Sequence, residues 1–117
     1  MKNNSKILFD KTTMGGTTKV VSPFINLENV YCFAFQHVAA GTTAAGSLQL
    51  FGSCDQELTE QGDGVVNWAS IDTAITISTL GTALVNKDGV GYRWIKFEYT
   101  PSNGTGTFSL ILNTKGN

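Results

Sequence analysis

The chain has 117 residues, 41% of them hydrophobic and 15% charged, and its formal net charge is −1 at pH 7. This length suits a single domain with a substantial core. Scattered basic residues and a near-neutral charge argue against nucleic-acid binding, which depends on Lys and Arg to neutralise phosphates. No apolar run reaches the 18 or so residues of a membrane span, and the polar start lacks the apolar segment of a signal peptide. We therefore expect folding in a cytoplasm, with no direct nucleic-acid or membrane partner.

Residues 1–18 are expected to form a loosely ordered N-terminal arm that precedes a β-sandwich domain at residues 19–117. The arm is mostly polar and glycine-containing, as mobile termini are. Its apolar run Ile7-Leu8-Phe9 is a candidate contact element. The domain opens with a short strand that Pro23 interrupts. Because proline cannot donate to a β-ladder, we expect this strand at a sheet edge.

The stretch Val30–Val38 predicts a strand, because aromatic residues alternate with small or polar ones. Tyr31, Phe33 and Phe35 share its expected buried face. Residues 39–46 are small and flexible and predict a hairpin loop, with residues 47–53 as the partner strand.

Further strands are predicted at residues 73–78 and around residues 83–85. The C-terminal part predicts a hairpin of strands 92–99 and 107–112, joined by a turn at Pro101-Ser102-Asn103-Gly104. About seven or eight short strands between turn signals, without helical periodicity, indicate an all-β fold. We expect one antiparallel β-sandwich or jelly-roll-like domain, with a strand order that the pattern leaves open.

The strand at 92–99 presents two alternating faces. Ile95, Phe97 and Tyr99 form one face, which we expect to be buried, and the opposite face is formed by Tyr92, Trp94, Lys96 and Glu98. If the second face is left uncovered, Trp94 is an interface anchor or a ligand platform. If it is covered, Trp94 belongs to the core and the Ile95 face lies outside.

Residues able to carry chemistry are few. The single histidine, His37, ends an aromatic strand face and is expected to be partly buried. Together with Cys32 and Cys54 it lacks a fourth ligand and suitable spacing for zinc. The two cysteines are expected as free thiols, with a disulfide as the alternative. The acidic stretch 54–66 matches no calcium-loop pattern. We predict no catalytic, cofactor or metal site and no enzyme.

Several sequence motifs resemble those of a family of small tailed-phage virion proteins. These motifs are N-W-x-x-I at residues 67–71, Y-R-W-I-K-F-E-Y-T at 92–100, G-T-G-T-F at 104–108 and N-T-K-G at 113–116. Where family members usually have a short link before N-W, this chain has the longer acidic insert 54–66. The resemblance implies a β-sandwich virion structural protein without a catalytic site, made in the host cytoplasm and residing in the virion.

Within that class we favour a capsid decoration (cement) protein that bridges capsomers and assembles as a homo-oligomer, with a trimer preferred. Its partners would be the major capsid protein or other virion proteins. The alternative is a tail or head-fibre module that attaches to host-surface glycan through exposed aromatic residues. The candidate contact residues are Ile7, Leu8, Phe9, Tyr92, Trp94 and Lys96.

Overall fold

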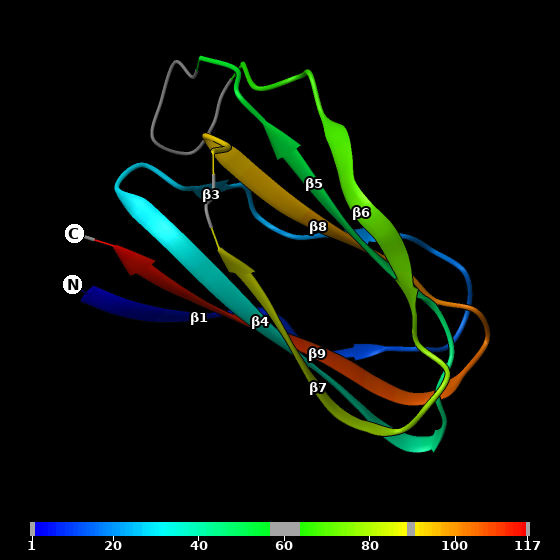
Figure 1. Ribbon diagram of the computed structural model, residues 1–117. Helices are drawn as coiled ribbons and strands as arrows, with labels where there is room; N and C mark the ends of the chain where they lie inside the picture. Colours follow the sequence, from blue (N-terminus) through cyan, green and yellow to red (C-terminus); the bar gives the residue numbers. More distant parts are fainter. Residues whose placement is uncertain (1, 57–63, 89–90, 117) are drawn as a thin grey trace.

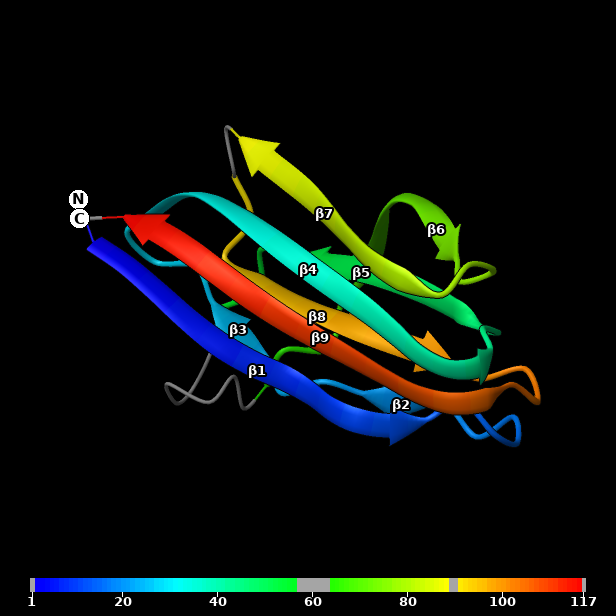
Figure 2. The same ribbon diagram turned by 90° about the horizontal axis from the view of Figure 1, so that it is seen from below.

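The structure is a computed structural model that describes residues 2–56, 64–88 and 91–116. Two antiparallel sheets face one another (Figures 1 and 2). Sheet A has the order β1 (Lys2–Thr13), β9 (Thr105–Gly116), β4 (Val30–Thr43) and β7 (Gly81–Asp88). Sheet B has the order β2 (Val20–Val21), β8 (Trp94–Thr100), β5 (Ser47–Ser53) and β6 (Ala69–Thr76), and β3 (Ile25–Asn26) also pairs with β8. The predicted all-β antiparallel sandwich is confirmed.

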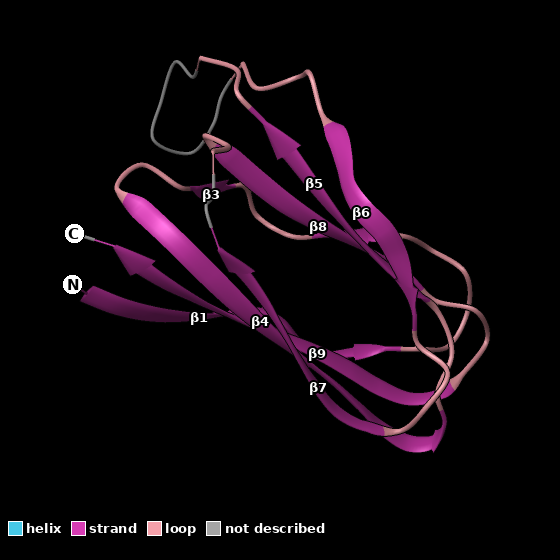
Figure 3. Ribbon diagram, in the orientation of Figure 1, coloured by secondary structure: helices cyan, strands magenta, loops and turns pink. Residues whose placement is uncertain are grey.

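The described residues contain strands, turns and loops but no helix (Figure 3), and so none that could span a membrane. Most connections cross between the sheets: β4 leads to β5, β6 to β7, and β8 to β9. The first strand pairs with the last, with Lys2 opposite Gly116. This order, β1-β9-β4-β7 facing β2-β8-β5-β6, is jelly-roll connectivity.

The core lies between the sheets and is built from alternating strand positions. In sheet B, Ile95, Phe97 and Tyr99 are fully buried, as predicted. From sheet A, Phe108 stacks on Tyr99 with ring centroids 4.2 Å apart, and Phe35 meets Phe97 edge-on at 5.0 Å. Such aromatic contacts add to the stabilisation that comes from buried apolar area.

The predicted C-terminal hairpin is wrong, because β8 and β9 lie in opposite sheets. The turn between them hydrogen-bonds to residues 14–16 and so does not close a ladder between β8 and β9. The Gly104 N–H donates to the Met14 carbonyl (2.8 Å), and the Asn103 N–H donates to the Gly16 carbonyl (2.9 Å). The two strands share the core by facing each other across it.

The predicted hairpin between residues 30–38 and 47–53 is also wrong. Strand β4 continues to Thr43 in sheet A, and β5 pairs with β6 and β8 in sheet B. Gly46 has φ +128° where the chain changes sheet, and a Cβ there would lie 2.7 Å from the Tyr99 ring. Glycine is required at this crossing, which the small residues of 39–46 signalled only as a flexible loop.

The N-terminal residues are not a loose arm. Residues 2–13 form β1, which pairs along β9 at the edge of sheet A. The polar side chains that suggested disorder are acceptable there, because an edge strand is open to water; Ser5, for example, donates to Asn113 Oδ1 (3.0 Å). The strand broken by Pro23 is confirmed as an edge: β2 and β3 flank the proline and both pair with β8.

Candidate functional site

The outer surface of sheet A carries a continuous uncharged band, which we call the open face. Core residues Phe35, Leu110 and Leu112 point toward sheet B, so their neighbours along each strand point outward. In the third of three successive cross-strand rows, the β1 positions beside Ser109 are the exposed, charged residues Asp10 and Lys11, which lie outside the open face as defined here. The other outward positions of these rows define the open face: Ser5, Ile7, Ala34, Gln36, Val38, Thr82, Leu84, Asn86, Ser109, Ile111 and Asn113. None of these side chains is charged, and the neighbouring row contains Lys115 and Asp88.

The middle row of the open face is apolar except for Gln36. Ile111 lies opposite Ile7 on one side and opposite Gln36 on the other, and Gln36 lies opposite Leu84. The side chains of Ile7 and Leu84 are 60% and 70% exposed. An uncharged surface with exposed aliphatic side chains has the composition of an interface core, where charged residues are depleted. The sequence analysis selected Ile7 but missed Leu84 and Ile111, which only the register brings together.

Leu8 and Phe9 do not join Ile7 as contact residues. They are 9% and 4% exposed and belong to the core cluster. The pairing of β1 with β9 shifts register between Ile7 and Phe9, and such a bulge lets two successive side chains face the same side. The structure therefore corrects this part of the expected contact run.

Trp94, expected as an exposed anchor if its face were uncovered, is fully buried. It lies on the outer side of sheet B, opposite to Ile95, which is also buried. The Arg93 guanidinium carbon lies 5.9 Å from the centroid of the Trp94 ring. On this outer side, Phe24 from the β2–β3 segment packs against Trp68 from the segment before β6, with ring centroids 4.9 Å apart. We call this covered outer surface of sheet B the closed face.

Lys96 and Tyr92 differ in exposure. Tyr92 is 37% exposed, so it is accessible. The Lys96 ammonium lies 4.9 Å from the centre of the Trp68 ring and 5.2 Å from that of Phe51, and it pairs with Glu98 at 3.0 Å. The positive charge of Lys96 is therefore engaged by contacts within the protein itself.

The carboxyl of Glu98 lies in the same cluster and also pairs with Lys19 at 3.0 Å. Burial by itself raises the pKa of Glu98, but the hydrogen bonds and charges of Lys96 and Lys19 outweigh it and hold the pKa below the ordinary value. The charges of Glu98, Lys96 and Lys19 on the closed face are thus paired with one another.

The other residues that the sequence offered for chemistry are His37, Cys32 and Cys54. His37 is half-buried and stacks on Phe108 with centroids 6.1 Å apart, and burial lowers its pKa. Cys32 and Cys54 are free thiols. Across the described ranges no three His, Cys, Asp or Glu side chains gather as metal ligands.

Most of the acidic stretch 54–66 lies outside the described residues. Of its described part, Asp55 accepts hydrogen bonds from the backbone N–H groups of Asn67 (2.8 Å) and Val66 (2.9 Å). These bonds lower the pKa of Asp55. The Asn67 of the N-W motif thus anchors the end of this loop.

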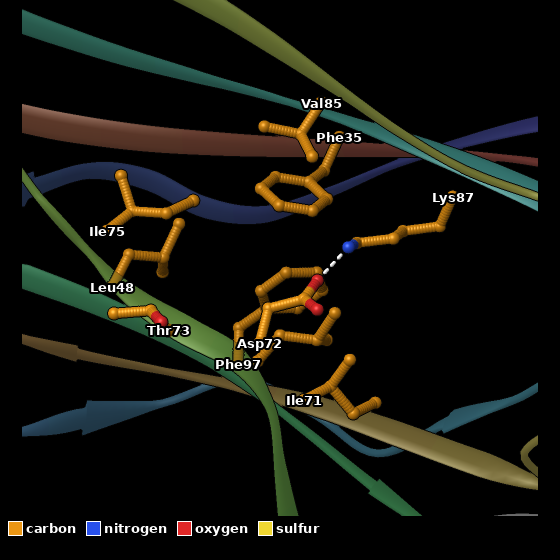
Figure 4. Close-up of a pocket in the computed structure, with 10 residues that line it drawn as sticks. Phe35, Leu48, Ile71, Asp72, Thr73, Ile75, Val85, Lys87 and Phe97 are labelled. Carbon is orange, nitrogen blue, oxygen red and sulfur yellow. Dashed lines mark hydrogen bonds and ion pairs between the residues drawn. The ribbon is translucent and has the colours of Figure 1, made fainter.

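An apolar cavity of about 230 Å³ lies between the sheets where β6 and β7 form their edges (Figure 4). Phe35, Leu48, Ile75, Val85 and Phe97 contribute to its lining, and Lys87 and Asp72 form an ion pair across it. Sequence reasoning missed this cavity because its lining comes from five separate strands.

The Asp72 carboxylate reaches Lys87 because β6 is bulged. Leu48 and Leu50 pair with Ile75 and Ile71, so β6 has extra residues between these positions. Asp72 takes φ +61° there, and Gln49 Nε2 donates to the carbonyls of Leu50 (2.8 Å) and Ile71 (3.1 Å). A bulge of this kind re-aims a side chain at the cost of a regular ladder.

No protein-family model matches the chain, and no curated protein matches it in sequence. Solved structures do share the fold. YomS, a protein derived from the SPBc2 prophage, is 10% identical with a TM-score of 0.58, covering 97% of this chain and 92% of YomS. A protein of Bacillus endospore appendages, described as disulfide-linked pili, is 13% identical with a TM-score of 0.52, covering 99% of this chain and 88% of the other. At these identities the likeness shows a common β-sandwich fold.

Proposed function

We propose that the protein is a non-enzymatic structural protein of a phage virion, and specifically a capsid decoration protein that binds the assembled shell through its open face. The observation that carries this proposal is the uncharged band across sheet A, with Ile7 and Leu84 exposed at the two ends of its middle row. The phage-like motifs at residues 67–71 and 92–100 and the fold shared with a prophage-derived protein support it.

The open face would act by burying apolar surface against neighbouring shell subunits. Stable interfaces remove about 1,200–2,000 Å² from water in total, and burial contributes roughly 25 cal/mol per Å² of apolar area before the costs of association. A protein bound across two capsomers resists their separation because both contacts must break together. The partner is the major capsid protein, and the protein resides in the virion after assembly in the host cytoplasm.

We further propose that the protein assembles as a homotrimer, since closed rings match the symmetry axes of a shell. Light scattering on the purified protein tests this. A mass of three chains supports the trimer, and a monomer at all concentrations contradicts it. Neither result decides whether the protein binds the shell, which is tested separately below.

An exposed aromatic cluster that contains Trp94 would favour the glycan-binding alternative. Because Trp94 is fully buried, no observation on the described residues favours that function over decoration. In the test below, this function corresponds to binding to host cells and not to capsids.

The proposal is tested by co-sedimentation of the purified protein with expanded capsids assembled without it, and in parallel with host cells. We expect saturable binding to capsids, with a copy number set by the shell symmetry. Binding to cells and not to capsids would overturn decoration in favour of a receptor-binding module.

A further inference from the structure

The edge strands of the sandwich differ in how they are protected against pairing with another chain. Strand β1 shifts register twice and has Lys11 at φ +51°. Strands β2 and β3 have two residues each around Pro23. Strand β6 is bulged at Asp72. These are the features by which natural edge strands avoid further pairing.

Strand β7 is more regular: its positive φ is confined to its first residue, Gly81, and its inward-pointing charge, Lys87, is paired with Asp72. It pairs with β4 at eight successive positions, from Gly81 opposite Ala39 to Asp88 opposite Cys32, without a register shift. Residues 81–86 contain no charge and no proline. Its other side has no partner in the strand order of sheet A, so a regular row of backbone groups is available for one more strand.

The cavity beside β7 has room that the chain's own side chains leave unfilled. Its volume is about 230 Å³, whereas an apolar cavity of roughly 150 Å³ already holds a benzene molecule. Val85 of β7 and Ile75 of β6 line it from the two edges (Figure 4). A strand added beside β7 would point alternate side chains toward this space.

We propose that β7 accepts an extended segment of another polypeptide as a fifth strand of sheet A, with one bulky apolar side chain of that segment inserted into the cavity. The proposal goes beyond shell binding, because it uses the edge and the interior of the sandwich and does not depend on the open face.

Charge defines the segment that fits. Residues 81–86 are uncharged, and Asp72 and Lys87 neutralise each other across the cavity. The complementary strand is therefore uncharged over about the same length, since a charge placed there would be desolvated without a partner. A second copy of β7 is a poor occupant, because its inward residue Val85 already packs against its own core.

The test uses the whole protein and the synthetic peptide KTVTFTVTK, acetylated and amidated, with a matched peptide in which Ser replaces Phe. Binding is followed by NMR of the labelled protein. We expect the Phe peptide to bind at millimolar concentration or tighter, about tenfold more tightly than the Ser peptide. The shifted and newly protected amides should lie in residues 81–88.

Three variants locate the binding. Val85→Phe fills the cavity and Ala83→Lys places an inward charge on the edge, so each should weaken the Phe peptide about tenfold or more. Leu84→Ser changes the outward neighbour on the same strand and should leave the affinity unchanged. If Val85→Phe fails to fold, Ala83→Lys alone decides.

Absence of binding, equal affinity for the two peptides, or affinity unaffected by Ala83→Lys would each overturn the inference. Shifts centred on β1 would also overturn it, because they would place the docking at the opposite edge. None of these results bears on shell binding, which Leu84 on the open face tests separately.

Discussion

The two outer surfaces of the sandwich are finished in different ways. The closed face of sheet B is covered by the chain itself, with Trp94 fully buried and Lys96 and Glu98 paired. None of the described segments covers the open face of sheet A in this way: Ile7 and Leu84 are more than half exposed. The same chain thus buries a tryptophan on one side and leaves aliphatic side chains in water on the other. Covering segments bury the outer side of sheet B, and under the proposed function the outer side of sheet A is the surface that contacts a partner.

Among the changes that test this difference between the two faces, substitution of Trp94 is expected to have the largest effect on stability. Trp94→Ala should lower the free energy of unfolding by about 3–5 kcal/mol, because it empties a fully buried site. Denaturant unfolding measures this. A wild-type midpoint would mean that the closed face is not covered in solution and that Trp94 is a surface residue after all.

A moderate effect is expected from pH on the closed face. The pKa of Glu98 is held below its ordinary value in the folded protein, so the unfolded chain binds a proton at higher pH than the folded chain. The stability that Glu98 contributes is therefore present above about pH 4.5 and lost as pH falls through its lower folded pKa.

This pH effect is checked by urea unfolding at pH 7, 4.5 and 3 for the wild type and for Glu98→Gln. The variant should lose less stability across the series than the wild type. Parallel pH profiles would show that the contacts of Glu98 with Lys96 and Lys19 do not persist in solution. The open face has no titratable side chain among its defining residues and should add nothing to the difference.

The smallest effect on stability is expected at Leu84, at the β7 edge of the open face. Leu84→Ala should change the free energy of unfolding by only about 0.5 kcal/mol, because the side chain is 70% exposed. The same denaturant measurement applies. A loss comparable to that of Trp94→Ala would mean that Leu84 is covered in the isolated protein, for example by self-association.

The sequence predicted which face of a strand is buried better than it predicted which strands pair with one another. Alternation at 92–99 and 107–112 correctly predicted Phe97 and Leu110 as core, because period-two patterns report which side is buried. The same pattern does not say which strand lies alongside. The turn after Pro101 fits a hairpin and an arch between sheets equally well, and its hydrogen bonds to Met14 and Gly16 decide in favour of the arch.

The candidate site was the least predictable part for a related reason. The central row of the open face joins Ile7, Ile111 and Leu84 from three distant segments, and only the register aligns them. Trp94 is buried on the closed face, where Phe24 and Trp68 come together from two other segments of the chain. Neither feature has a local signal in the sequence.

The central claim is that the open face, and not the closed one, contacts the shell. Its most direct test is capsid co-sedimentation of Leu84→Glu beside Ser70→Glu, which places the same charge at an exposed position of β6 in sheet B. Both variants should unfold at close to the wild-type midpoint, and Leu84→Glu alone should lose capsid binding, since an uncompensated charge buried in an interface is costly. Undiminished binding of Leu84→Glu, or equal loss in both variants, would contradict the account.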